Sequence, residues 1–176
     1  MSPETTESSP GKRGELTFRT PTVDDGSAMY QLVKDTGVLE PNTRYAYLLL
    51  ATHFADHCLL AEQGGEVVGC VASYRPPSHP EAIFVWQIGV RKDARGQGLA
   101  KRMLHELVKR PANVDVRFLE ATVDPGNEPS CRLFRAFARE QGVPCEVSPG
   151  FTPEHFGPAE HPPEDLHRIG PLRREP

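Results

Sequence analysis

A glycine-bearing loop between an apolar strand and an amphipathic helix constrains the fold of this chain more than any other feature. The run IFVWQIGV (83–90) is almost continuously apolar, as in strands that are covered on both faces. The loop RKDARGQG (91–98) follows, and after it apolar residues recur at helical spacing. Glycines at the entry to a helix let several backbone N–H groups point outward together, where the helix dipole favours negative charge. The pattern therefore predicts a phosphate-binding turn at the start of a helix.

Three nucleotide-binding patterns use such a loop, and two of them fail here. A P-loop needs Gly-Lys followed by Ser or Thr, which this loop lacks. A dinucleotide-binding turn needs a third small residue at the position that Lys101 occupies. The third pattern, R/Q-x-x-G-x-G/A, is satisfied by Arg95, Gly98 and Ala100. For the motif on its own, an ordinary glycine-rich helix start remains the alternative.

The remaining periodicities predict alternating strands and helices around this unit. Strands are expected at 16–22, 58–63, 66–74, 83–90 and 116–123, with a hairpin turn at Gly64-Gly65. Helices are expected at 24–36, 43–55, 98–110 and 129–141. The proline-rich stretch 144–176 is expected to be irregular, with short strands at most. This order indicates one mixed α/β domain over 15–172, with a disordered tail at 1–14 and a short tail at 173–176.

Composition excludes several classes of protein. The 176 residues carry 20 Lys+Arg against 24 Asp+Glu, a net charge of -4, which argues against nucleic-acid binding. No apolar run approaches the roughly 20 residues that cross a bilayer, and the polar opening MSPETTESSPGKRGE resembles neither a signal nor a transit peptide. The four cysteines lack C-x-x-C spacing, so reduced thiols in the cytoplasm are expected. His53 and His57 have a zinc-compatible spacing but no third ligand, so we expect no metal.

The third loop pattern is that of the acyl-CoA pyrophosphate loop of the GCN5-related N-acetyltransferases, and the order of expected elements also resembles theirs. More narrowly, five blocks resemble the L-2,4-diaminobutyrate acetyltransferases of ectoine biosynthesis: YAYLLLATHF (45–54), SYRPP (73–77), FVWQIGV (84–90), ARGQGLAKRML (94–104) and LEATVDPGN (119–127). The similarity runs over most of residues 16–171. It implies the N-acetyltransferase fold, a mixed central sheet with a splayed acetyl-CoA strand and flanking helices.

The activity that this resemblance implies is transfer of an acetyl group from acetyl-CoA to the γ-amino group of L-2,4-diaminobutyrate. The enzyme would be cytoplasmic and homodimeric, and would supply a compatible solute under osmotic stress. Two alternatives stay open: the same fold acting on another small amine or on a protein amino group, or a non-catalytic acetyl-CoA sensor. Direct transfer in a ternary complex is expected, because no cysteine lies in a recognisable nucleophile arrangement.

The resemblance also implies which residues bind acetyl-CoA. Ile88 and Val90 lie on the strand whose main chain would pair with the pantetheine arm and receive the thioester oxygen. The pyrophosphate loop and the next helix start contribute Arg95, Gly96, Gln97, Gly98, Leu99, Ala100 and Asn127. There are two interpretations of Lys101, Arg102 and Arg132: they contact the phosphates of coenzyme A, or they lie on solvent-exposed faces of their helices.

The acceptor side needs acidic and aromatic groups. An alkylamine has a pKa near ~10.4, so the site must lower that pKa, accept the proton, or both. Many relatives use a tyrosine on the last helix to protonate the leaving thiolate, but the matching residue here is Phe134. The expected catalytic carboxylates are Glu164 and Glu120. Expected substrate-binding residues are Glu40, Tyr45, Trp86, His161 and Glu164, with the indole stacked on an ammonium-bearing chain. The alternative for the three glutamates is a carboxylate in solvent, and the alternative for Tyr45 and Trp86 is packing in the core.

Overall fold

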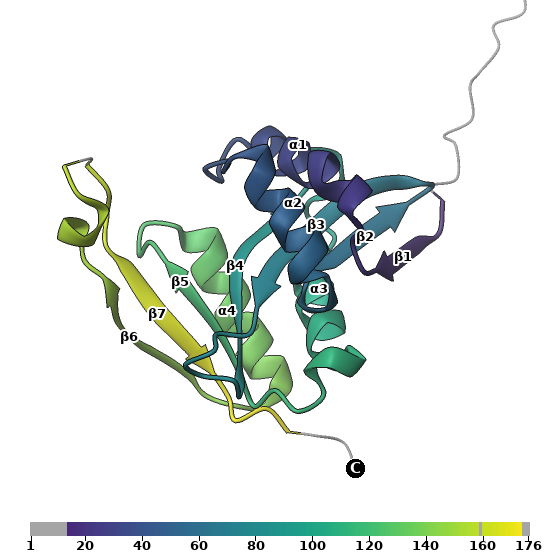
Figure 1. The fold of residues 1–176 in the computed structure, drawn as a ribbon. Coiled ribbons are helices and arrows are strands. Elements are labelled where there is room, and N and C mark those ends of the chain that lie inside the picture. Colours follow the sequence, from purple (N-terminus) through teal and green to yellow (C-terminus); the bar gives the residue numbers. More distant parts are fainter. Residues whose placement is uncertain (1–13, 159, 174–176) are drawn as a thin grey trace, which may run out of the picture.

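The protein, studied as a computed structural model, is described over residues 14–158 and 160–173. Its centre is a seven-stranded sheet in the order β1-β2-β3-β4-β5-β7-β6 (Figure 1). The strands are β1 (Leu16–Arg19), β2 (Leu59–Gln63), β3 (Glu66–Tyr74), β4 (Ala82–Val90), β5 (Phe118–Val123), β6 (Cys145–Phe151) and β7 (Glu164–Ile169). Only β4 and β5 pair in parallel, and the other neighbours are antiparallel. The expected mixed α/β fold is therefore confirmed. Most of the expected tail at 1–14 lies outside the described residues.

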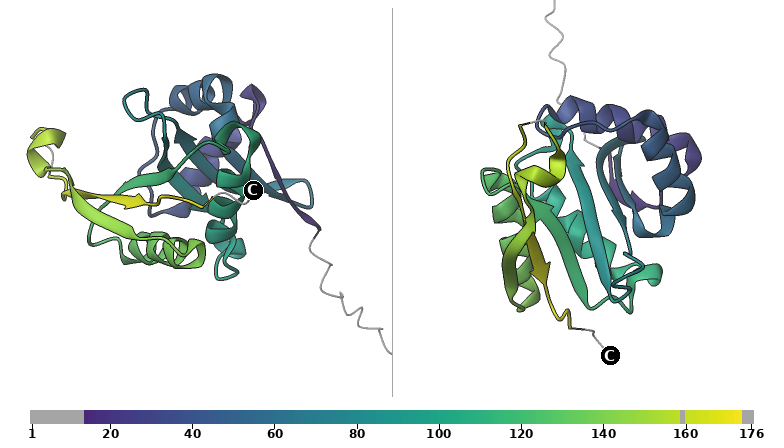
Figure 2. Two further views of the ribbon diagram at one scale, coloured as in Figure 1. Left: turned by 90° about the horizontal axis from the view of Figure 1, so that it is seen from below. Right: turned by 60° about the vertical axis from the view of Figure 1, so that its left-hand side comes forward.

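Helices cover both faces of the sheet, as the right-hand view of Figure 2 shows. The helices are α1 (Gly26–Thr36), α2 (Arg44–His53), α3 (Leu99–Lys109) and α4 (Glu128–Gln141). Alternation along β2 sends Leu59 and Ala61 into the core under α3 and α4, and Leu60 into the core under α1 and α2. The sheet is thus buried on both sides at its centre, which explains the near-continuous apolar runs in the sequence.

β4 and β5 are hydrogen-bonded over a short stretch and then diverge, and this splay opens a gap between the two strands. Their pairing covers only Ala82–Phe84 against Phe118–Glu120, although β4 continues to Val90. On its other edge β4 pairs with β3 from Phe84 to Val90, but the register passes from Val85 opposite Ser73 to Gln87 opposite Ala72. Trp86 is therefore the extra residue of a β-bulge. The expected splayed strand is present.

The C-terminal stretch is more regular than expected. β7 inserts between β5 and β6 and pairs with both over its length, so this stretch contributes two strands to the sheet. β6 is the edge strand, and most of its residues are exposed, so it lacks the in-out alternation that marks a strand in a sequence. Pro149 is tolerated there because an edge strand has one side without a partner. The expectation of an irregular stretch with short strands at most over 144–176 therefore allowed for these strands but underestimated how much of the stretch joins the sheet.

Candidate active site

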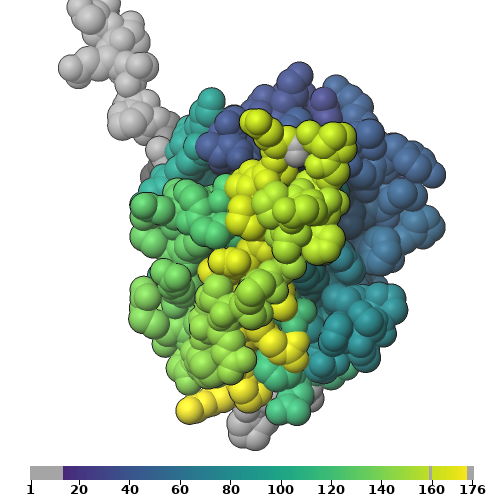
Figure 3. Space-filling view, turned by 90° about the vertical axis from the view of Figure 1, so that its left-hand side faces the viewer, coloured from purple at the N-terminus to yellow at the C-terminus, as the bar shows by residue number. Residues whose placement is uncertain are grey.

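A cavity of about 1870 Å³ opens where β4 parts from β5. Its walls come from the second half of β4, the end of β5, the starts of α3 and α4, the α1–α2 segment (37–43) and the β6–β7 segment (152–158 and 160–163). Figure 3 shows the β6–β7 segment lying over this side of the molecule, close to α1 and α2. The cavity therefore joins a loop suited to phosphate with a region closed in by two irregular segments.

The start of α3 forms a cradle of backbone N–H groups. Gly96 and Gly98 have φ of 75° and 69°, and no atom lies within 4 Å of a Cβ built on either, so backbone conformation is what requires glycine. The first helical bond of α3 runs from the Arg102 N–H to the Gly98 carbonyl at 3.1 Å. The preceding N–H groups of the first turn lack helical partners, which suits an anion.

Arg95 braces the cradle instead of projecting from it. Its Nε donates to the Val90 carbonyl at 3.1 Å and its Nη2 to the Thr36 carbonyl at 2.9 Å. The guanidinium thus ties the loop to the end of β4 and to the end of α1. Arg95 lines the cavity together with Gly96, Gly98, Leu99 and Ala100, whereas Gln97 does not.

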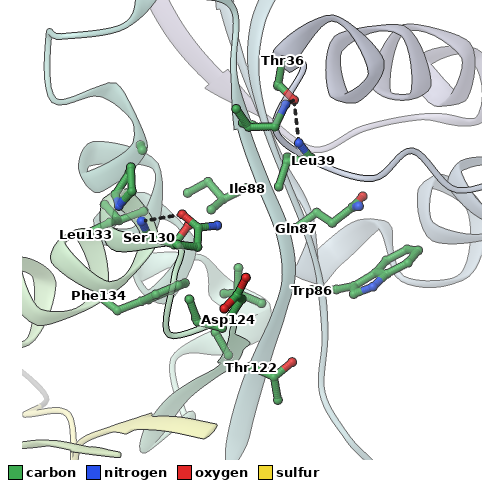
Figure 4. Close-up of a pocket in the computed structure, with 18 of the residues that line it drawn as sticks. Thr36, Leu39, Trp86, Gln87, Ile88, Thr122, Asp124, Ser130, Leu133 and Phe134 are labelled. Atoms are coloured by element: carbon green, nitrogen blue, oxygen red, sulfur yellow. Dashed lines mark hydrogen bonds between the residues drawn. The ribbon is translucent and has the colours of Figure 1, made fainter. Parts of the chain in front are cut away.

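At the unpaired edge of β4, the backbone of Ile88 and Val90, the two residues predicted to pair with pantetheine, is accessible. The Arg91 N–H bonds to Val68 on β3, and successive N–H groups of a strand point in opposite directions. The N–H groups of Ile88 and Val90 therefore face the gap toward β5. Figure 4 shows the Ile88 side chain pointing across this gap toward Ser130 and Leu133 of α4. An extended amide chain such as pantetheine can pair with this edge.

The cations near the cradle are already engaged. Lys101 donates to Glu140 at 2.5 Å, and Arg132 pairs with Glu128 at 2.9 Å. The Arg102 guanidinium lies 5.6 Å from the centre of the Phe18 ring. Asn127 caps α4, where its side chain accepts the Ser130 N–H at 3.2 Å, and it lines the cavity. The cradle therefore offers an anion its backbone N–H groups more than charged side chains.

Four of the five predicted substrate-binding residues line the cavity, and one does not. Glu40, Trp86, His161 and Glu164 line it, whereas Tyr45 is 67% exposed and does not. Tyr47, two residues later, lies beneath the site: its ring stacks on Trp86 at 6.3 Å between centroids, and burial raises the pKa of its hydroxyl. A helix turns by about 100° per residue, so residues two apart face nearly opposite sides.

His161 lies in the β6–β7 segment in contact with a second aromatic ring. It stacks on Phe156 with 3.7 Å between ring centroids, and its Nδ1 donates to the Pro162 carbonyl at 2.6 Å. Phe156 and Pro162 also line the cavity. This packed corner narrows the acceptor end, which favours a small acceptor over a peptide.

The two predicted catalytic carboxylates have different surroundings. Glu120 is buried and hydrogen-bonded to Arg168, which also pairs with Glu81 at 3.5 Å and lies over the Phe118 ring. Glu164 accepts a hydrogen bond from the Thr122 hydroxyl at 2.5 Å, and within the described residues it has no Lys or Arg partner. Both carboxylates line the cavity, but only Glu164 is free of a neutralising cation.

Sequence reasoning missed several polar residues that line the cavity. They are Gln87, Thr122, Asp124 and Ser130. Ser130 precedes the buried Phe134 by one helical turn, so its position on the same face could have been read from the spacing. The others depend on how the strands are paired, which carries no local signal.

Metal and thiol chemistry find no support among the described residues. No group of three or more His, Cys, Asp and Glu side chains is gathered there, and His57 instead bonds to Asn113 at 2.7 Å. None of the four cysteines lines the cavity. Burial raises the pKa of Cys58 to about 11 and that of Cys70 to about 12, so neither thiol ionises near neutral pH.

In the described part of the chain, the helices are too short or too polar to cross a membrane.

Comparison with known proteins identifies related sequences and structures. The model of the acetyltransferase (GNAT) family matches residues 26–138. L-2,4-diaminobutyric acid acetyltransferase from Shouchella clausii is 42% identical over 158 residues, which is 90% of this chain and 88% of that protein. The enzyme of the same name from Chromohalobacter salexigens is 45% identical over 89% of this chain and 82% of its own. Diaminobutyrate acetyltransferase EctA from Paenibacillus lautus, solved in complex with its substrate L-2,4-diaminobutyric acid and coenzyme A, is 40% identical with a TM-score of 0.87, covering 93% of this chain and 99% of that chain.

Proposed function

This chain belongs to the GNAT acetyltransferase family, and we propose that it transfers the acetyl group of acetyl-CoA to the γ-amino group of L-2,4-diaminobutyrate. The product is N-γ-acetyl-diaminobutyrate, a precursor for ectoine biosynthesis. One observation carries the proposal: a single cavity joins the N–H cradle of α3 to a narrow pocket with an acidic and aromatic lining. Similarity to diaminobutyrate acetyltransferases over nearly the whole chain supports the choice of acceptor.

The cofactor is bound mainly by backbone groups in this account. The pyrophosphate lies at the start of α3, where Gly96 and Gly98 open the N–H cradle. The pantetheine arm runs along the free edge of β4, pairing with Ile88 and Val90. An N–H group of this edge then receives the thioester oxygen, which stabilises negative charge as the carbonyl is attacked.

The acceptor is bound by carboxylates and by one aromatic face. Glu164 and Glu40 attract the ammonium groups of diaminobutyrate, and the half-exposed Trp86 ring packs against its chain. The amine must lose a proton before it attacks, and we assign that proton to Glu164, directly or through one water. Glu120 forms an ion pair with Arg168 and so helps to hold β5 and β7 together at the wall of the cavity.

Transfer is direct in this account, within a complex of enzyme, acetyl-CoA and amine. The amine nitrogen forms a bond to the thioester carbon, the carbon–sulfur bond breaks, and coenzyme A leaves as the thiolate. The nitrogen, which carries a second excess proton after the attack, releases it to water and becomes the amide N–H. Because a thiol has a pKa near ~8.5, the thiolate departs without the hydroxyl that Phe134 lacks. The absence of cysteines from the described cavity lining supports this route over an acetylated enzyme.

We infer a homodimeric, cytoplasmic enzyme that acts without nucleic acid or a membrane. The apolar side chains of Tyr45, Leu48 and Leu49 share one exposed face of α2, and such a face gains free energy when it is covered. All four cysteines are free, as in proteins of reducing compartments. Light scattering of the wild type and of a Leu48→Asp variant tests the dimer, which we expect the charge to weaken.

The test of the activity is release of coenzyme A from acetyl-CoA in the presence of a panel of amines. The panel contains L-2,4-diaminobutyrate, ornithine, lysine, spermidine and a peptide with a free N-terminus. We expect the highest kcat/KM for diaminobutyrate. Turnover on another amine alone would keep the acetyl-CoA site and refute the acceptor. Binding of acetyl-CoA without turnover on any amine would instead identify a sensor.

A further inference from the structure

The amide of Gln87 connects β4 to the α1–α2 segment through two hydrogen bonds. Its Oε1 accepts the Tyr47 hydroxyl at 2.8 Å, and its Nε2 donates to the Glu40 carbonyl at 2.9 Å. The Tyr47 oxygen in turn accepts the Asn42 N–H at 3.3 Å. Gln87 is 9% exposed and Tyr47 is fully buried, so these bonds are shielded from water.

The bulge in β4 explains why Gln87 reaches this position. Neighbouring residues of a regular strand point to opposite faces. The extra residue at Trp86 interrupts that alternation, and Figure 4 shows Trp86 and Gln87 on the same side of β4, away from Ile88. The indole and the amide therefore border the acceptor end together.

The segment that Gln87 holds has few other attachments. Earlier in the segment, the Thr36 hydroxyl accepts the N–H of Leu39 at 3.2 Å. Among the described residues, the hydrogen bonds that tie residues 40–42 to elements outside the segment are those from Gln87 and to Tyr47. The segment lines the cavity, and the exposed Glu40 carboxylate lies on it.

We propose that Gln87 is a positioning residue for the amine acceptor: its amide fixes residues 40–42 against β4 and so sets the Glu40 carboxylate relative to the Trp86 indole. This inference rests on the proposed function. Gln87 makes its two bonds to Glu40 and to Tyr47, whose ring stacks on Trp86, so it acts through these residues and does not itself take part in the chemistry. A substrate with two ammonium groups is recognised by this spacing, which a chain longer by one methylene fits less well.

The test compares Gln87→Met, which keeps the length of the side chain and removes both hydrogen bonds, with the wild type. We expect the KM for diaminobutyrate to rise about tenfold, the scale of losing one to two buried hydrogen bonds, while the KM for acetyl-CoA changes less than about twofold. We also expect the preference for diaminobutyrate over ornithine, as a ratio of kcat/KM, to fall about fivefold.

Asn113→Leu is the matched control for a loss of stability. Asn113 is also a buried amide with two hydrogen bonds. Its Nδ2 donates to the Leu107 carbonyl and its Oδ1 accepts from His57, both at 2.7 Å. Unlike Gln87, Asn113 does not line the cavity. This control should lower the melting temperature and leave both KM values unchanged. If Gln87→Met behaves as this control does, Gln87 is only structural and the inference is overturned.

A second variant keeps the test decisive if Gln87→Met does not fold. Tyr47→Phe preserves the bond from Gln87 to Glu40 and releases Asn42, so we expect the same selective rise in the amine KM, of about threefold. An unchanged amine KM in that variant would refute the inference. A wild type that does not acetylate diaminobutyrate would refute the proposed function itself, before any variant is compared.

Discussion

The Thr122 hydroxyl donates a 2.5 Å hydrogen bond to Oε2 of Glu164, joining neighbouring strands β5 and β7 at the wall of the cavity. The bond fixes one carboxylate oxygen, so the orientation of the other is also set. This geometry depends on β7 being inserted beside β5. The strand insertion thus places an oriented carboxylate at the acceptor end.

Removing the Thr122 hydroxyl should weaken catalysis without abolishing it. We expect Thr122→Val to lower kcat/KM for diaminobutyrate at least about tenfold, since a hydrogen bond to a charged group contributes about 1.5–3 kcal/mol. Thr122→Ser keeps a hydroxyl and serves as the control, with activity close to that of the wild type. Steady-state kinetics measure both, and equal activity of the Val and Ser variants would show that the bond does not orient Glu164.

Substitution of Glu164 and of Glu120 should have different effects on turnover and on stability. We expect Glu164→Gln to lower kcat at least about a hundredfold, because it removes the proton acceptor, with little change in melting temperature. Glu120→Gln leaves Arg168 without its closest partner, so we expect it to lower the melting temperature more than kcat. The opposite pattern, a stable Glu120→Gln protein that has lost turnover, would move the catalytic role to Glu120.

Gly98 should be required for binding acetyl-CoA. At its φ of 69°, a Cβ meets no atom within 4 Å, so the cost of Gly98→Ala is conformational, about 1–2 kcal/mol. We expect the KM for acetyl-CoA to rise about tenfold as the cradle relaxes. Gly142→Ala is the control: Gly142 ends α4 with a φ of 64° and the same free space, away from the cavity. If both variants raise this KM equally, the cradle is not the cause.

How far the sequence predicts the fold depends on whether the signal is local. The strand–loop–helix unit around Gly98 and the hairpin at Gly64-Gly65 are predicted because apolar periodicity and glycine conformation act within a few residues. The extent of β6 is missed because most of its residues are exposed and show no in-out alternation, and because Pro149 suggests a break where an edge strand tolerates it. The extent of β7 is missed because it pairs with β5, far earlier in the sequence.

The site is predicted in part for the same reason. The cradle, Trp86 and Glu164 follow from motifs and resemblance, and all of them line the cavity. That Arg168 neutralises Glu120 is visible only once β7 is paired with β5. The sequence favours Tyr45 because it is aromatic and close to Glu40, but the phase of α2 exposes Tyr45 and buries Tyr47 under the site instead.

Acid should weaken the contact between β1 and the turn before α1. Arg19 donates hydrogen bonds of 2.8 Å to both oxygens of Asp25, which lowers the pKa of that carboxyl from 3.8 to about 2. A carboxyl with a lowered pKa in the folded protein stabilises it above the unfolded pKa and loses that contribution as the pH falls through the folded pKa. Because the Arg19 side chain is 38% exposed, we expect Asp25→Asn to lower the free energy of unfolding by only about 1 kcal/mol at pH 7.

Denaturant unfolding at several pH values measures this difference between the wild type and Asp25→Asn. The difference should persist down to about pH 4, shrink as the pH falls toward the folded pKa of about 2, and disappear only below that pH, where Asp25 is protonated in both states. A difference that is the same at pH 2 and pH 7 would show that the ion pair does not stabilise the fold.

The central claim is tested most directly by identifying the product of the reaction between acetyl-CoA and L-2,4-diaminobutyrate. NMR of the purified product locates the acetyl group, because the protons next to the acylated nitrogen shift and couple to the new amide. We predict a single product acetylated on the γ-nitrogen, formed together with an equal amount of coenzyme A. Acetylation of the α-nitrogen, or release of coenzyme A without an acetylated amine, would contradict the account.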